Sequence, residues 1–315
     1  MTSPSVDSLE ISKTREDLNA RLEALGLLLE KDCPFEQIRT RSESEPLPEG
    51  VWRKLREAGW LETGASDGVN VAALARAMGE QGLPAHCAEH LVGLISSGFT
   101  ADSDTRLCLA LAPRLAARHV IVRFAAWARE AIISGNGRAV ILSVQQMPAL
   151  RTIAGEGWLR LRLPSGSVNA EDVDSLALRR WLHLSRAAET YGVLTRLFRL
   201  TRDYVTQRQQ FGRPLGSFQA VQHKIADMVV GLVATEALIC KAIGDVDVRH
   251  VWAARLCVDS IAQKTASDAV QLHGAMGLSR EYPAELFYRR TQMLRLGQEQ
   301  REDLLSSMWS KEGRP

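Results

Sequence analysis

An arginine at the end of a predicted helix is the residue of this sequence best suited to hold a charged ligand. Its segment reads Arg208-Gln-Gln-Phe-Gly-Arg-Pro-Leu-Gly-Ser. Glycine and proline at these positions should end the helix and leave Arg208 at an exposed corner. A guanidinium there suits a pyrophosphate, which it can bind through paired charge-assisted hydrogen bonds. The alternative is that Arg208 and Arg213 only hydrate a loop between two helices, as surface arginines often do.

Two histidines and a glutamate form a second candidate site. His86-Cys-Ala-Glu-His90 has the H-x-x-E-H order of inverted zinc metallopeptidases, in which both histidines chelate zinc and the glutamate acts as a base. Pro84 places His86 in the first helical turn, where the spacing of the pair is least secure. Two ligands do not complete a zinc site, so we expect no metal here and histidines that face solvent or pack loosely. Gly135-Asn-Gly lacks the third glycine of a dinucleotide loop and is interpreted as a turn.

Three zones of different pattern must position these residues. The N-terminal zone, 1–100, has apolar side chains at helical spacing. Helices are predicted there over 51–61, 71–81 and 86–96. The middle zone, 101–170, has the turn signal Ser134-Gly-Asn-Gly-Arg followed by β-branched and alternating runs, which favour a small sheet. Its predicted strands cover 139–144 and 158–163.

The C-terminal zone, 171–315, is helical again. Apolar and small residues recur along each predicted helix, so antiparallel helices could pack closely as a four-helix bundle. The stripe of one helix is formed by Val221, Ile225, Met228, Val229 and Leu232. The three zones predict a mostly α protein with a small sheet in the middle.

Composition excludes several classes of function. Of the 315 residues, 45% are hydrophobic and 24% are charged, as in a globular protein with a substantial core. A net charge of +2 without a basic block argues against nucleic-acid binding. No apolar run reaches the roughly 18 residues of a membrane span, and the N-terminus does not resemble a signal peptide. Five cysteines without a C-x-x-C pair favour reduced thiols and a cytoplasmic location.

The segments at 208–228 and 271–283 closely resemble the C-terminal helical domain of the acyl-CoA dehydrogenases. The first matches the family's Arg-x-x-Phe-Gly-x-Pro followed by Phe-Gln-x-x-Gln. The second, Gln271-Leu-His-Gly-Ala-Met-Gly, matches Gln-x-x-Gly-Gly-x-Gly with Ala275 in place of the middle glycine.

The resemblance implies FAD as the cofactor. In the family the arginine of the first segment meets the flavin pyrophosphate of a neighbouring subunit, and the phenylalanine packs near the adenine part. The second segment lies against the adenosine end, where backbone without Cβ lets a bulky dinucleotide approach closely. The cofactor-binding residues implied here are Arg208, Phe211, Gln219, Gln271, Gly274 and Gly277.

The resemblance is strong from about 186 to 290 and moderate over 45–80, but poor between 100 and 170. Relatives have a larger β-domain there, with a Thr-Glu-Pro-x-Ala-Gly-Ser-like loop and a Trp-Ile-Thr stretch that hold the flavin ring and the thioester end of the substrate. Neither stretch occurs in this sequence. The resemblance therefore implies an acyl-CoA dehydrogenase-like fold with a reduced middle β-domain, which cannot complete an active site alone.

The catalytic base of the family's reaction has no orthodox counterpart. The reaction removes the α-proton of an acyl-CoA thioester while a hydride leaves Cβ, so a desolvated carboxylate must lie against the α-carbon. Most relatives use a glutamate nine residues past an arginine that matches Arg289, and this position falls on Gln298. Glu299 beside it becomes the base only with a one-residue gap, and a solvated helix face is its competing interpretation. The other base position of the family falls on Leu182.

These features favour one subunit of an unequal pair. Some bacterial members of the family, which act on CoA thioesters of steroid side chains and degraded rings, combine subunits with partial sites into heterotetramers. We expect a full-length partner to hold the flavin ring and supply the base, with electron-transfer flavoprotein as electron acceptor. The alternatives are a self-sufficient homo-oligomer that uses Glu299, and a scaffold subunit without catalysis. A zinc peptidase is the most remote alternative.

Overall fold

Two of the N-terminal helices pack against the first long helix of the C-terminal zone. The computed structural model describes residues 6–34, 37–38, 48–64, 67–97, 105–112, 119–124, 127–135, 137–144, 150, 152–153, 158–163, 170, 172–244 and 247–296. The helices before the sheet are α1 (Val6–Asp32), α3 (Glu49–Glu57), α4 (Asp67–Glu80) and α5 (His86–Ser96). The predictions over 51–61, 71–81 and 86–96 are confirmed as α3, α4 and α5. Helix α3 ends earlier than predicted, before Gly59 with φ of +74°.

Two glycines bring α4 into backbone contact with α6 (Ser175–Gln207). A Cβ atom on Gly79 would lie 2.4 Å from the carbonyl oxygen of Glu189. A Cβ atom on Gly192 would lie 2.2 Å from the carbonyl oxygen of Arg76. Because no real Cβ tolerates such distances, only glycine permits this crossing. The crossing joins the N-terminal helices directly to the C-terminal bundle.

The middle zone forms two small pieces of sheet. Its strands are β1 (Leu107–Leu111), β2 (His119–Val122), β3 (Glu130–Gly135), β4 (Arg138–Ser143) and β5 (Leu159–Arg162). One sheet has the order β1-β3-β4, with β1 parallel and β4 antiparallel to β3, and the other pairs β2 with β5 antiparallel. Gly137, with φ of +70°, lies in the turn between β3 and β4 and confirms the predicted turn.

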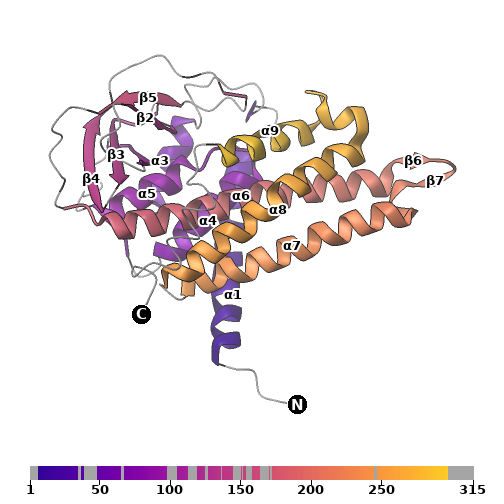
Figure 1. The fold of residues 1–315 in the computed structure, drawn as a ribbon, viewed down its shortest axis with the longest axis horizontal. Helices are drawn as coiled ribbons and strands as arrows, with labels where there is room; N and C mark the ends of the chain where they lie inside the picture. Colours follow the sequence, from indigo (N-terminus) through magenta and orange to yellow (C-terminus); the bar gives the residue numbers. More distant parts are fainter. Residues whose placement is uncertain are drawn as a thin grey trace.

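The C-terminal zone is a bundle of α6, α7 (Gln219–Gly244), α8 (Val248–His273) and α9 (Pro283–Arg295) (Figure 1). Asp174 caps α6 by accepting hydrogen bonds from the backbone N–H groups of Leu176 and Ala177. The apolar stripe predicted for α7 is wrong at Val229, which is 39% exposed beside the still more exposed Val230. None of the described helices combines the length and apolar character that a membrane crossing needs.

The predicted fold class is confirmed: the protein is mostly α, with N-terminal helices, a small middle sheet and a C-terminal four-helix bundle. Helix α5 ends at Ser96, and the strands of the middle zone lie between Leu107 and Arg162. The domain boundaries at about 100 and 170 stay predictions.

Candidate functional site

Arg208 directly follows α6, where the sequence predicts it. Its backbone N–H donates to the carbonyl oxygen of Tyr204 at 2.8 Å, and its own carbonyl accepts from Leu215 at 2.9 Å. The backbone is thus fixed on both sides. The side chain is exposed, and within the described part of the chain the guanidinium makes no hydrogen bond or ion pair. It is free to bind a group from outside.

A two-residue turn presents Phe211 to solvent. The short strands β6 (Gln209–Gln210) and β7 (Arg213–Pro214) pair as a hairpin that projects from the end of the bundle (Figure 1). Phe211 and Gly212 have φ of 53° and 78°, as in a type I′ turn. Phe211 is 89% exposed, and its ring meets only the edge of Phe218 among the ring contacts of the described residues, with centroids 6.1 Å apart. A strained backbone that holds an apolar ring in water favours a contact outside this chain.

Gln219 is the first residue of α7 and is exposed. The nearby Gln222 has a different function, because its side-chain nitrogen donates to the carbonyl oxygen of Gly216 at 3.0 Å and closes the loop. Gln219 therefore remains available at the surface, beside the same loop as Arg208 and Phe211.

The second predicted segment forms the turn η2 (Gly274–Leu278) after α8. Gly274 has φ of +61°, and a Cβ atom there would meet nothing within 4 Å, so its exposed backbone is open to approach. Glycine is needed at position 277 for a different reason, because a Cβ atom on Gly277 would lie 2.8 Å from the carbonyl oxygen of Val270. Gly277 is buried and serves the packing of the turn onto α8, whereas Gln271 is exposed.

An aromatic cluster holds the two segments at one end of the bundle. The ring of Tyr204, one turn before Arg208, lies 4.6 Å from the ring of His273 and 5.8 Å from that of Tyr282. His273 donates through Nδ1 to the carbonyl oxygen of Ala269 at 2.8 Å, and burial lowers its pKa below 6.5. The neutral ring therefore packs as an apolar group. The structure thus brings the ends of α6 and α8 together, as a shared ligand would require.

These residues fit one side of a dinucleotide site. Arg208 offers an unpaired cation, Gly274 offers open backbone, and Gln271 offers an exposed amide. Gly277 is the exception, since internal packing explains it. Arg208, Gln271 and Gly274 are all exposed, so the opposite side of a dinucleotide bound to them would be open to contact with another chain.

A buried ionic cluster, which sequence reasoning missed, lies where the three zones meet. We call it the ionic junction, and its members are Glu89, Arg123, Arg186, Glu189 and Arg290. Glu189 on α6 accepts hydrogen bonds from Arg123, which follows β2, at 3.2 Å and from Arg290 on α9 at 3.1 Å. Glu89 on α5 lies 3.7 Å from guanidinium nitrogens of both Arg123 and Arg186. Burial lowers the pKa of Arg186 to about 10, which still leaves it charged.

The histidines of the H-x-x-E-H segment are buried, so the prediction of solvent-facing or loosely packed rings is wrong. His86 and His90 are 0% and 2% exposed. His86 donates through Nδ1 to the carbonyl oxygen of Pro84 at 2.7 Å and packs on Trp127 with centroids 4.5 Å apart. Burial lowers the pKa of His86 to about 3 and that of His90 to about 4. Glu89 faces arginines, and no metal-binding group of three side chains occurs among the described residues.

Candidate bases remain few. Gln298 and Glu299 lie outside the described residues. Leu182 is fully buried and apolar. Glu89 and Glu189 are buried carboxylates, but arginines hold both, so the structure uses them as counter-charges. One feature of the sequence could have indicated that Glu189 is buried: it is a charged residue on a helix face of small residues such as Ala188 and Gly192.

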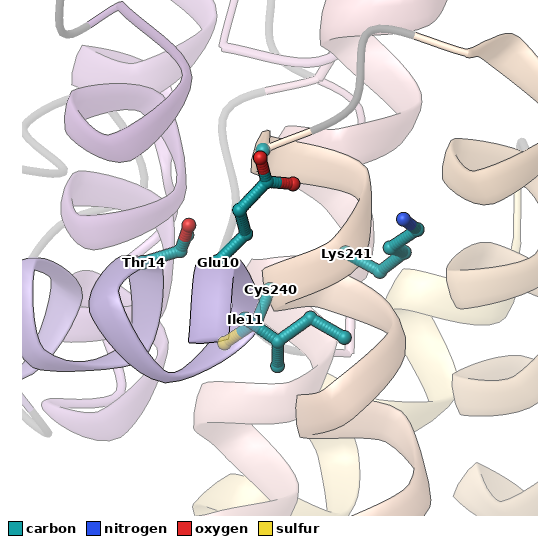
Figure 2. Close-up of a pocket in the computed structure, with 6 residues that line it drawn as sticks. Glu10, Ile11, Thr14, Cys240 and Lys241 are labelled. Atoms are coloured by element: carbon teal, nitrogen blue, oxygen red, sulfur yellow. The ribbon is translucent and has the colours of Figure 1, made fainter. Parts of the chain in front are cut away.

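A surface hollow lies far from the cofactor candidates. Figure 2 shows it between α1 and α7, lined by Glu10, Ile11, Thr14, Cys240, Lys241 and Gly244. Cys240 and Gln219 are 21 positions apart on α7, on the order of 30 Å at the helical rise. Burial raises the pKa of Cys240 to about 11, so its thiol is protonated and unreactive. The hollow offers no reactive chemistry.

Comparisons with known proteins relate the C-terminal part of the chain to acyl-CoA dehydrogenases. Residues 175–300 match the family model described as acyl-CoA dehydrogenase, C-terminal domain. "Acyl-CoA dehydrogenase IpdE2" of Mycobacterium tuberculosis is 34% identical over 127 residues, 39% of this chain and 40% of that protein. The matched part thus spans well under half of that relative. "3-sulfinopropanoyl-CoA desulfinase" of Paraburkholderia xenovorans is 34% identical over 111 residues, which are 34% of this chain and 29% of that protein.

Solved structures share the fold over nearly the whole chain. A chain of the ChsE4–ChsE5 complex from Mycobacterium tuberculosis matches with a TM-score of 0.79 and 19% identity, over 95% of this chain and 98% of that one. Butyryl-CoA dehydrogenase from Megasphaera elsdenii matches with a TM-score of 0.71 and 16% identity over the full length of both chains. The C-terminal part of this chain thus matches the acyl-CoA dehydrogenase family in sequence, and the chain as a whole shares the fold of these solved structures.

Proposed function

We propose that this chain is one subunit of an acyl-CoA dehydrogenase, and that the FAD-dependent α,β-desaturation of an acyl-CoA thioester takes place at a site it shares with a second chain. The observation that carries the proposal is the outward orientation of the cofactor candidates. The Arg208 guanidinium is unpaired, and Phe211 is 89% exposed on a projecting hairpin. Groups arranged in this way can reach a ligand that another chain encloses.

The two chains would then contribute different parts of the active site. Arg208 would hold the pyrophosphate of the flavin, and Gln271 with Gly274 would line its adenosine end. The flavin, when bound, supplies the hydride acceptor. A full-length partner would surround the ring and provide the carboxylate that removes the α-proton, because the buried carboxylates among the described residues are all paired with arginines or lysines. Electron-transfer flavoprotein would take up the electrons.

The ChsE4–ChsE5 complex, a chain of which shares this fold at 19% identity, is by its name an assembly of unlike chains, and the proposal extends that arrangement to this chain. The test is to purify the chain alone and co-expressed with a full-length relative from its own gene neighbourhood. Flavin absorbance and assembly mass are then measured. We expect flavin absorbance and a mixed oligomer only when the partner is co-expressed.

Other outcomes favour the alternatives. A yellow, active homo-oligomer of this chain alone would contradict the shared site and direct attention to Glu299. A Glu299→Gln variant that keeps flavin and loses turnover would then identify the base. A chain that binds no flavin, either alone or with its partner, would be a scaffold subunit.

A further inference from the structure

The aromatic cluster at the ends of α6 and α8 adjoins both groups that would hold the dinucleotide. Arg208 lies one helical turn after Tyr204, and Gly274 directly follows His273. The guanidinium and the open backbone therefore come from segments far apart in the sequence, and nothing along the chain fixes the distance between them. That distance depends on the side chains that pack between the two helix ends.

Three rings make this packing. The ring of His273 lies 4.6 Å from that of Tyr204 on α6 and 5.0 Å from that of Tyr282, which precedes α9. The two tyrosine rings lie 5.8 Å apart, so each of the three rings is within the usual range of aromatic contact with the other two. His273 is 2% exposed, and its Nδ1 donates to the carbonyl oxygen of Ala269 on its own helix, which fixes the direction of the ring. The cluster thus joins α6, α8 and the start of α9 at one point.

The turn η2 also packs on His273. A Cβ atom on Gly277 would lie 3.0 Å from the Cβ atom of His273, so the turn folds back over this residue. Gly274, the first residue of the turn, has φ of +61° directly after His273. A displacement of His273 would therefore carry the backbone of Gly274 with it.

We propose that His273 is a positioning residue, whose ring sets the distance between the Arg208 guanidinium and the open backbone of Gly274. The rings of Tyr204 and Tyr282 hold it in place from α6 and from the start of α9. This inference rests on the proposed function. A ligand that spans both groups binds tightly only where the geometry lets both engage at once, whereas a fragment that reaches one group does not sense their separation.

The experiment uses the co-expressed complex with its bound FAD and follows flavin release by the fluorescence of free FAD. Dilution gives the dissociation constant of FAD, and competition gives inhibition constants for ADP, adenosine and inorganic pyrophosphate. ADP spans both groups, adenosine reaches only the side of Gly274, and pyrophosphate reaches only Arg208. For His273→Ala we expect the constants of FAD and ADP to rise at least about fivefold, and those of adenosine and pyrophosphate to stay within about twofold.

Two further variants separate positioning from stability. His273→Phe keeps a ring between the two tyrosines and should hold the constants of FAD and ADP within about twofold of the unsubstituted complex. Gly192 lies 16 positions before Arg208, on the order of 24 Å along α6. Gly192→Ala should therefore lower the melting temperature and leave the inhibition constant of ADP unchanged.

Unchanged constants of FAD and ADP in His273→Ala, or an equal rise for all four ligands, would overturn the inference. If His273→Ala does not assemble, Tyr204→Leu removes the ring on α6 instead and must show the same selective loss. Failure of the proposed function gives a different result: the unsubstituted complex then holds no flavin, or its flavin is not released by ADP.

Discussion

Glu189→Gln tests the energetic importance of the ionic junction. Glu189 is the counter-charge of Arg123 and Arg290, and it also accepts from the backbone N–H of Ala85 at 3.2 Å. The amide keeps the volume of the carboxylate but removes its charge and turns an NH2 group toward guanidinium donors. Removing one partner of a buried ion pair costs about 3–5 kcal/mol, because the remaining charges stay in the interior without compensation. The free energy of unfolding should fall by that amount.

Calorimetry and urea unfolding of the purified protein measure the loss, which corresponds to a fall of the melting temperature by roughly 5–8 °C for a chain of 315 residues. The matched control is Glu57→Gln. Glu57 is 65% exposed and lies 3.9 Å from Nε of Arg53, so its removal should cost under about 0.5 kcal/mol. The double variant Glu189→Gln/Arg290→Met should be less destabilised than the sum of the single variants. Equal melting of Glu189→Gln and Glu57→Gln would refute the reasoning.

Three further predictions concern the glycine crossing of α4 and α6, the partly buried charges around Glu236, and the cofactor candidate Arg208. Gly192→Ala should lower the free energy of unfolding, measured in urea, by about 1–3 kcal/mol or more, because the new Cβ would lie 2.2 Å from the carbonyl oxygen of Arg76. The control is Gly26→Ala: a Cβ there meets nothing within 4 Å, so this variant should stabilise α1 by up to about 1 kcal/mol. Burial raises the pKa of Glu236, but its hydrogen bonds and charge interactions with Arg15 and Arg76 outweigh this and hold the pKa below 4.5. Its stabilisation is therefore present above about pH 4.5 and lost as the pH falls through the lower folded value, so melting curves of Glu236→Gln should depend less on pH below 5. An unchanged pH dependence would contradict this. Arg208→Ala should lower the flavin content of the complex severalfold without changing the melting temperature of the chain alone, and equal flavin content would remove Arg208 from the site.

Local patterns predicted the helices α3, α4 and α5, the strands β4 and β5, and the turn that contains Gly137, but not the strands β1, β2 and β3. Helix α5 covers 86–96 as predicted, and Arg208 directly follows α6 because Gly212 and Pro214 act on the backbone nearby. The ionic junction could not be predicted in this way. Its members come from four elements far apart in the sequence, and their pairing depends on how those elements pack.

Burial of single residues was equally hard to foresee. Val229 has the spacing of a core residue on α7, yet α7 lies at the edge of the bundle and exposes this face. His86 and His90 lie in a segment that suggests metal chemistry, but the aromatic rings of Trp52 and Trp127 surround them and favour neutral packing. A sequence pattern predicts one face of a helix better than it predicts what covers that face.

The glycine crossing of α4 and α6 affects how this fold can change during evolution. Since Gly79 and Gly192 let the two helices meet backbone to backbone, the N-terminal and C-terminal helices support each other without relying on the sheet between them. Deletions in the strands and loops that spare Arg123 then leave that contact intact and cost the protein ligand-enclosing surface rather than its fold. Under the proposed function, the sheet is the part that a lineage can shorten, because a second chain then supplies the ligand-enclosing surface that is lost.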